Sequence, residues 1–201
     1  MSLMSELYKL KKEDIKKAAD VLVDAYTEDP VMKLVFQDDE QRRIQFKVML
    51  KFCIKYGDVF TPSNNFEGIM CILPYENADM TVPRIILSGG FLLSLRLMKF
   101  RKMMEQSIKA IEEVKKNLDV GPYIYLFIIG VQQKLQGKGF AGKMLRALVE
   151  KAENEHKPMY LETQVEKNVS LYEKYGFYVY LKKDIPEPLN LPFWFMIRDA
   201  K

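Results

Sequence analysis

The sequence predicts an α/β fold, because its C-terminal half alternates strand-like and helix-like segments. Residues 123–129 form an unbroken run of β-branched and aromatic residues, which is typical of a strand buried on both faces. A polar loop follows, and apolar residues then recur at helical spacing from Phe140 to Ala152. The next predicted elements are a strand, a helix and two strands, at 159–161, 169–175, 177–181 and 191–197.

The N-terminal half predicts a mixture of helices and short strands. Asp14 is placed to cap a first helix, and the Glu28-Asp29-Pro30 stretch ends it. Turn-forming residues separate the later segments. The predicted elements are a strand at 7–10, helices at 15–26 and about 40–56, and paired strands at 59–60 and 68–73.

Residues 81–118 predict a helical insertion between the two halves. Thr81 can cap a helix, Pro83 suits its first turn, and Gly89-Gly90 breaks or bends it. The segment is strongly apolar. It therefore either adds to the core or forms a lid over a hydrophobic ligand.

Composition limits the classes of protein to consider. The 201 residues fit one domain spanning 1–201, and 48% of them are apolar, as in a folded soluble protein. The net charge of +4 suits a small polyanionic ligand, but no basic block is dense enough to predict a nucleic-acid partner. Cys53 and Cys71 are predicted to be buried free thiols. Because His156 is the only histidine in the sequence, no metal site is expected.

The sequence also bears on location. No secretory signal is apparent, and the longest apolar stretch, 85–95, falls well short of the roughly 20 residues that a membrane span requires. We therefore expect a cytoplasmic protein without a membrane partner. The sequence does not distinguish a monomer from a homodimer.

The loop from Gln136 to Lys143 matches three phosphate-binding patterns. In each, small residues let the backbone approach an anion at a helix N-terminus. The patterns are G-x-G-x-x-G through Gly137, Gly139 and Gly142, G-x-x-x-x-G-K through Gly137, Gly142 and Lys143, and Q/R-x-x-G-x-G/A through Gln136, Gly139 and Ala141.

The surrounding sequence separates these patterns. A P-loop needs Ser or Thr after the lysine, and Met144 stands there. A dinucleotide site begins directly at a strand end, whereas residues 130–135 intervene here. Glu162, about 20 residues after the loop, does favour the dinucleotide interpretation. A turn that merely starts a helix is the remaining alternative.

A second motif lies downstream and favours the third pattern. Asn168-x-x-x-Tyr172-x-x-x-Gly176-Phe177 follows the strand at 159–161. Together with Gln136-x-x-Gly139-x-Ala141, it resembles the GNAT superfamily of N-acyltransferases. Leu161-Glu162-Thr163 and the terminal run 193–198 resemble its puromycin N-acetyltransferase-like branch.

This resemblance covers residues 123–198 and implies both fold and cosubstrate. The expected fold has a mixed, mostly antiparallel sheet of about six or seven strands flanked by helices, with an acetyl-CoA-binding core at 123–183. The expected partners are acetyl-CoA and an unidentified amine, without a metal. By resemblance, the cofactor-binding residues are Ile129, Val131, Gln136, Gly137, Lys138, Gly139, Phe140, Ala141, Gly142, Asn168 and Tyr172.

The resemblance also assigns backbone and side-chain roles. The strand edge near Gly130, where a bulge or irregular end would fit, opens so that the backbone groups of Ile129 and Val131 pair with pantetheine. Asn168 holds a pantetheine amide, and the Tyr172 hydroxyl protonates the departing thiolate. A core tyrosine is the competing interpretation of Tyr172.

The catalytic base is less defined. Many members of the superfamily carry an acidic base on the strand equivalent to 123–129, and this strand has no carboxylate. Glu162, at the end of the next strand, is the leading candidate for the base or amine-binding acid, and a salt-bridged surface glutamate is the alternative. Tyr125, Glu28 and Asp29 are possible substitutes.

Three functions follow from these motifs. The first is an acetyl-CoA-dependent N-acetyltransferase acting on a primary amine. Release of free CoA thiol in the presence of amines would reveal this activity. The second is a non-catalytic acyl-CoA-binding module of the same fold. The third is a nicotinamide- or nucleotide-dependent enzyme.

Overall fold

A computed structural model describes residues 2–36, 38–96 and 98–200. Leu97 of the predicted insertion and the limits of the predicted domain, Met1 and Lys201, lie outside the described residues. The described strands form one seven-stranded sheet in the order β1-β2-β3-β4-β5-β7-β6. The strands are β1 (Tyr8–Lys9), β2 (Asp58–Thr61), β3 (Gly68–Pro74), β4 (Ile124–Val131), β5 (Met159–Thr163), β6 (Tyr178–Ile185) and β7 (Leu191–Arg198).

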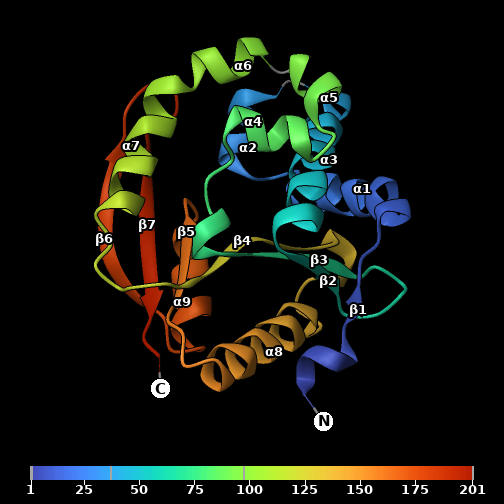
Figure 1. Cartoon of the computed structure of the whole chain (residues 1–201), viewed down its shortest axis with the longest axis vertical. Coiled ribbons are helices and arrows are strands. Elements are labelled where there is room, and N and C mark those ends of the chain that lie inside the picture. Colours follow the sequence, from blue (N-terminus) through green and yellow to red (C-terminus); the bar gives the residue numbers. More distant parts are fainter. Residues whose placement is uncertain (1, 37, 97, 201) are drawn as a thin grey trace.

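Within this sheet β4 and β5 are parallel, and the other neighbouring strands are antiparallel. The predicted mixed and mostly antiparallel sheet is therefore confirmed. α1 and α3 cover one face, and α8 covers the other (Figure 1). The α-helices are α1 (Ile15–Ala25), α2 (Pro30–Val35), α3 (Asp39–Tyr56), α4 (Val82–Leu87), α5 (Phe91–Leu95), α6 (Met98–Met103), α7 (Glu105–Lys116), α8 (Phe140–Asn154) and α9 (Glu166–Glu173).

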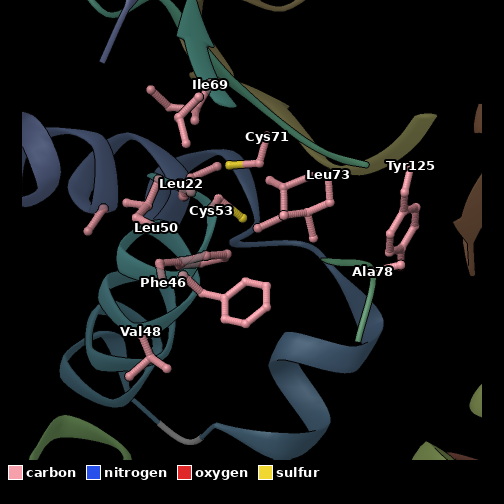
Figure 2. Close-up of a cluster of buried hydrophobic side chains, with 14 of the residues drawn as sticks. Leu22, Phe46, Val48, Leu50, Cys53, Ile69, Cys71, Leu73, Ala78 and Tyr125 are labelled. Carbon is pink, nitrogen blue, oxygen red and sulfur yellow. The ribbon is translucent and has the colours of Figure 1, made fainter. Parts of the chain in front are cut away.

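Two hydrophobic clusters form the core, one on each face of the sheet. The first joins α1 and α3 to the sheet, and Figure 2 shows Leu22, Phe46 and Leu73 packed within it beside the thiols of Cys53 and Cys71. Both cysteines are buried and free, as predicted. The second cluster packs α8 and α9 against the opposite face. Each sheet face thus gains an apolar cover, which drives the layered fold.

Several element boundaries differ from the sequence prediction. β6 continues to Ile185, because its pairing with β7 runs on to Leu191. α9 begins three residues before the predicted Val169, at Glu166. The Asp14 carboxylate does not cap α1 but accepts hydrogen bonds from Lys11 N and the Tyr8 hydroxyl, at 2.8 and 2.9 Å.

The insertion is helical, as the sequence predicts, and divides into α4, α5, α6 and α7. The break between α4 and α5 falls at Gly89-Gly90, with Gly89 at a φ of 76°. Lys51 and Lys55 of α3 donate hydrogen bonds to the carbonyls of Gly89 and Leu87, at 2.8 and 2.5 Å. These bonds attach the end of α4 to α3. They also satisfy carbonyls at the helix end that have no partner within the helix.

The described part of the chain contains no helix long and apolar enough to cross a membrane.

Candidate active site

The site is built around an opening between β4 and β5. The two strands pair only at Ile124–Met159 and Tyr125–Tyr160. β4 nevertheless continues to Val131, paired with β3, and β5 continues to Thr163, paired with β7. The facing edges of the two strands therefore separate beyond Tyr125, in the middle of the sheet (Figure 1).

The ladder between β3 and β4 determines which backbone groups face this opening. The N–H of Gln132 donates a hydrogen bond to Glu67 O at 3.0 Å, so this pair directs its backbone groups toward each other. In an antiparallel ladder the direction alternates from residue to residue. The N–H and C=O groups of Ile129 and Val131 consequently point away from β3, toward the opening.

Both of these carbonyls already have partners within the chain. The Tyr26 hydroxyl, at the end of α1, donates a hydrogen bond to Ile129 O at 3.1 Å. The Gln136 side-chain amide donates one to Val131 O at 3.2 Å. Their N–H groups therefore remain as the backbone donors of this edge.

Gly130 has a different role from the one expected of it. A Cβ at this position would lie 2.8 Å from the Tyr26 ring and 3.0 Å from Ala25 Cβ. Glycine therefore allows α1 to approach β4 closely. The register shift of β4 lies instead between Cys71 and Ile72 of β3, where Phe127 is the extra residue. The bulge expected at Gly130 is thus found three residues earlier.

The predicted phosphate loop connects β4 to α8. Gly137 and Gly139 have positive φ values of 76° and 86°, and α8 begins at Phe140 directly after them. A Cβ built on either glycine would meet nothing within 4 Å. The loop and its exposed residue Lys138 thus border open space at a helix N-terminus, where an anion is favoured by the unpaired N–H groups and the helix dipole.

Gly142, the third glycine, is buried and serves packing. A Cβ there would lie 2.7 Å from the Tyr175 hydroxyl, so this glycine allows α8 to pack against the end of α9. Its neighbours Phe140 and Ala141 are half-buried and pack against the apolar cluster beneath α8.

The residues of the Tyr172–Gly176-Phe177 motif form the C-terminal cap of α9. Phe177 N donates to Tyr172 O at 3.3 Å and Gly176 N donates to Glu173 O at 3.0 Å, which is the Schellman arrangement. Gly176 supplies the required positive φ, 83°. The Tyr172 and Phe177 rings make the accompanying apolar contact, with centroids 5.9 Å apart. This cap fixes the position of Tyr172.

Tyr172 is buried, and burial raises the pKa of its phenol above the ordinary 10.0. Its hydroxyl has no hydrogen-bond partner among the residues that the structure describes. Asn168, one turn earlier in α9, has its side-chain amide 3.5 Å from Thr163 Oγ1 at the end of β5. α9 therefore presents both residues beside the β5 edge of the opening.

Glu162 lies on the other face of β5. Side chains alternate along a strand, so Glu162 shares the face of Tyr160, which belongs to the cluster beneath α1 and α3. Its carboxylate accepts hydrogen bonds from the Tyr125 and Tyr160 hydroxyls, at 2.6 and 2.7 Å. Burial, followed by the nearby Glu162 charge, raises the pKa of both phenols. Both tyrosines are therefore donors at neutral pH.

The structure adds residues that the sequence prediction did not place at the site. Burial, followed by the nearby Tyr172 phenol, raises the pKa of the Tyr26 phenol. Asp29 accepts a hydrogen bond from the side-chain amide of Gln164, just beyond β5, and one from Met32 N at 2.9 Å. No sequence pattern identified Tyr26 or Gln164, because their partners are distant in the chain.

The proposed substitutes for the base differ in their surroundings. Burial raises the pKa of the Asp29 carboxyl, although its hydrogen bonds oppose this effect. Glu28 is exposed and forms an ion pair with Lys33. Tyr125 is buried and hydrogen-bonded to Glu162. Among the described residues, no group of three or more His, Cys, Asp or Glu side chains is arranged to hold a metal ion.

Known proteins match both the sequence and the fold of this chain. The family model for the acetyltransferase (GNAT) family matches residues 107–177. An uncharacterized N-acetyltransferase of Schizosaccharomyces pombe is 29% identical over 212 residues, which cover 96% of this chain and 83% of that protein.

Solved structures share the fold at low sequence identity. A histone acetyltransferase from Corynebacterium glutamicum has a TM-score of 0.69 and 18% identity, covering 97% of this chain and 96% of its own. Arylalkylamine N-acetyltransferase 2 from Aedes aegypti has a TM-score of 0.62 and 15% identity, covering 97% and 98%.

The family model, the relative and the shared fold together support assignment of this chain to the GNAT superfamily and to the acyltransferases. The fold of the superfamily implies an acyl-CoA cosubstrate. Assignment to the puromycin N-acetyltransferase-like branch remains a prediction.

Proposed function

We propose that this protein transfers an acetyl group from acetyl-CoA to a primary amine of a small molecule. The observation that carries the proposal is the opening between β4 and β5, with Tyr172 on one face of the sheet and Glu162 on the other. Two substrates can meet through such an opening, each approaching from its own side. We also propose that residues 1–201 act as one domain, with the cofactor core at 123–183.

The loop and α9 carry the donor side of the proposal. Gly137 and Gly139 leave room for a pyrophosphate at the start of α8, where backbone N–H groups are unpaired. The N–H groups of Ile129 and Val131 face the opening and would pair with pantetheine and the thioester oxygen. Asn168 would hold a pantetheine amide from the β5 side.

Glu162 carries the acceptor side. β4 itself lacks a carboxylate, but Tyr125 of β4 donates a hydrogen bond to Glu162 of β5 and so holds an acid beside the β4 edge. Glu162 would bind the ammonium form of the acceptor and take its proton. A neutral amine is then available as the nucleophile.

The reaction balances with these two side chains. The amine nitrogen forms a bond to the acetyl carbon as the carbon–sulfur bond breaks, and Tyr172 gives its proton to the departing thiolate. Glu162 releases the proton taken from the ammonium group to solvent before the attack, and it then takes the second proton that leaves the nitrogen. Exchange with solvent afterwards restores Glu162 and Tyr172. Burial raises the pKa of the Tyr172 phenol, so this residue carries its proton at neutral pH, as a general acid must.

Release of free CoA thiol tests this function directly. Purified protein with acetyl-CoA and a panel of small amines should release thiol only in the presence of an acceptor, with a matching acetylated product by mass. A protein that binds acetyl-CoA but acetylates no amine would instead be an acyl-CoA-binding module. Thermal stabilisation by NAD(P) or ATP, but not by CoA, would overturn the donor assignment.

A further inference from the structure

One segment of the insertion has an unusual combination of charge and exposed apolar surface. Residues 80–104, which we call the basic apolar segment, contain no Asp or Glu. Their five basic residues are Arg84, Arg96, Lys99, Arg101 and Lys102. The whole chain has 31 Lys and Arg against 27 Asp and Glu, so the rest of the chain has a net charge of −1. The excess of positive over negative charge in the protein therefore comes from this segment.

The same segment exposes large apolar side chains. Eight of the fifteen large hydrophobic residues that are exposed in the described part of the chain lie within it, although it is only 25 residues long. Leu92 is 77% exposed, Leu87 64% and Met98 61%. An open groove of about 730 Å³ runs between α4, α5, α6 and α7 beside them. Apolar surface gathered in this way indicates an interaction site rather than ordinary scatter.

The cations of this surface are available to a partner. Arg96 and Arg101 are exposed and form no ion pair with the residues that the structure describes, and exposed Lys102 lies near Glu105, which is itself ion-paired with Lys109. Arg101 and Lys102 border the groove next to exposed Met98, whereas α7 lines its other side with Glu105, Lys109 and Glu112. Arg84 is different, because it donates hydrogen bonds to Glu76 O and Asp79 O at 2.9 and 3.4 Å.

The position of the segment leaves this surface accessible. α5 and α6 lie at the end of the molecule opposite α8 and both chain ends (Figure 1). Lys51 and Lys55 hold the end of α4 against α3, so the short helices beyond it project from an anchored base. A surface at this end can make contact without covering the loop at the start of α8.

We propose that the basic apolar segment docks the protein reversibly on an anionic phospholipid surface. Short amphipathic helices with Lys and Arg beside Phe, Leu and Met bind at the lipid interface by combining apolar insertion with attraction to acidic headgroups. Charge complementarity selects this partner, because the segment that exposes the apolar side chains also has five basic residues and no acidic one. This departs from the sequence expectation of no membrane partner, and it involves surface binding rather than a span.

Vesicle co-sedimentation of the full chain tests the proposal and requires no enzymatic activity. We expect binding to vesicles that are one third phosphatidylglycerol and two thirds phosphatidylcholine, and little binding to pure phosphatidylcholine. Each Lys or Arg near an anionic lipid surface strengthens binding through its attraction to the headgroups. The double variant Arg101→Glu/Lys102→Glu should therefore bind at least about 30-fold more weakly. Leu92→Ser should also weaken binding, by about fivefold or more, because the side chain no longer enters the lipid.

The matched control is Lys12→Glu/Lys16→Glu, which makes the same change in net charge at exposed lysines outside the segment. It should bind nearly as well as the unaltered protein, and melting curves should show all variants folded. Equal binding to neutral vesicles, or equal loss in both double variants, would overturn the proposal. Failure of the unaltered protein to bind, or unchanged binding by Leu92→Ser, would overturn it as well.

Discussion

The Tyr26 hydroxyl donates a 3.1 Å hydrogen bond to the carbonyl oxygen of Ile129, on the edge of β4 that faces away from β3. α1 can reach this edge because Gly130 has no side chain. Tyr26, at the end of α1, thus occupies the Ile129 carbonyl oxygen, which would otherwise be free to accept a hydrogen bond from a ligand. What remains at Ile129 is its N–H donor, which suits an oxygen of the thioester or of pantetheine.

The close approach of α1 to β4 predicts a specific coupling. Gly130→Ala should lower the free energy of unfolding by about 1–3 kcal/mol, because the new methyl group would meet the Tyr26 ring. In a protein that already carries Tyr26→Leu, Gly130→Ala should lower the free energy of unfolding by distinctly less. Denaturant unfolding of the four proteins of this cycle measures the coupling. Equal costs in both backgrounds would show that the ring does not determine the glycine.

The loop assignment predicts the effect of a charge at Gly139. Gly139→Asp should abolish the rise in melting temperature that acetyl-CoA produces, since a side chain and a negative charge would both meet the pyrophosphate. Acetyl-CoA at about 100 times its dissociation constant should contribute about 2.7 kcal/mol in the unaltered protein. Gly121→Asp is the control, because Gly121 also has a positive φ and open space around it. An unchanged shift in the Gly139 variant would remove the loop from the cofactor site.

Tyr172→Phe tests the general acid. We expect kcat to fall by about 10²–10⁴-fold, while the affinity for acetyl-CoA changes little because the ring and its contact with Phe177 remain. The raised pKa of Tyr172 keeps the phenol protonated, so it should cause no loss of kcat up to pH 10. Tyr178→Phe, at an exposed tyrosine on β6, is the control. A Phe variant with full kcat would exclude Tyr172 from proton transfer.

Glu162→Gln tests the acceptor side. Turnover at neutral pH should fall more than acetyl-CoA binding weakens, because the amide can accept a hydrogen bond from one tyrosine but cannot take a proton. Tyr125→Phe should cause a smaller loss, since it removes one of the two hydrogen bonds that orient the carboxylate. Steady-state rates across pH with one working amine, and calorimetry with acetyl-CoA, provide the comparison. Full activity in Glu162→Gln at every pH would make this glutamate structural.

The Asp29 carboxyl predicts a pH dependence of stability. Burial raises its pKa in the folded state above the ordinary 3.8, so the folded protein retains a proton that the unfolded chain has released. This contribution to stability is complete below pH 3.8 and is lost as the pH rises through the raised pKa. Asp29→Asn should remove that component while keeping the cap on α2, because asparagine is also a good N-cap residue.

The measurement for Asp29 is the difference in unfolding free energy between the protein and the variant across this range of pH. Asp38→Asn serves as the control, since Asp38 caps α3 in the same way but is exposed. A difference that does not vary with pH for Asp29→Asn would show that the carboxyl titrates alike in the folded and unfolded states.

The sequence by itself determined the elements that depend on local pattern. The buried strand at 123–129, the glycine loop before Phe140 and the break at Gly89-Gly90 were predictable, because side-chain periodicity and glycine act over a few residues. The spacing from Tyr172 to Gly176-Phe177 was likewise visible, since a helix cap is a local structure.

Only the tertiary structure decided which distant residues surround the opening. Tyr26 and Ile129 are 103 residues apart, and Gln164 and Asp29 are 135 apart, so neither pair leaves a local pattern. The same is true of the two hydroxyls that hold Glu162, because the pairing of β4 with β5 brings Tyr125 to it. Short-range pattern specifies a strand or a turn, whereas burial of both sheet faces selects the packing that assembles the site.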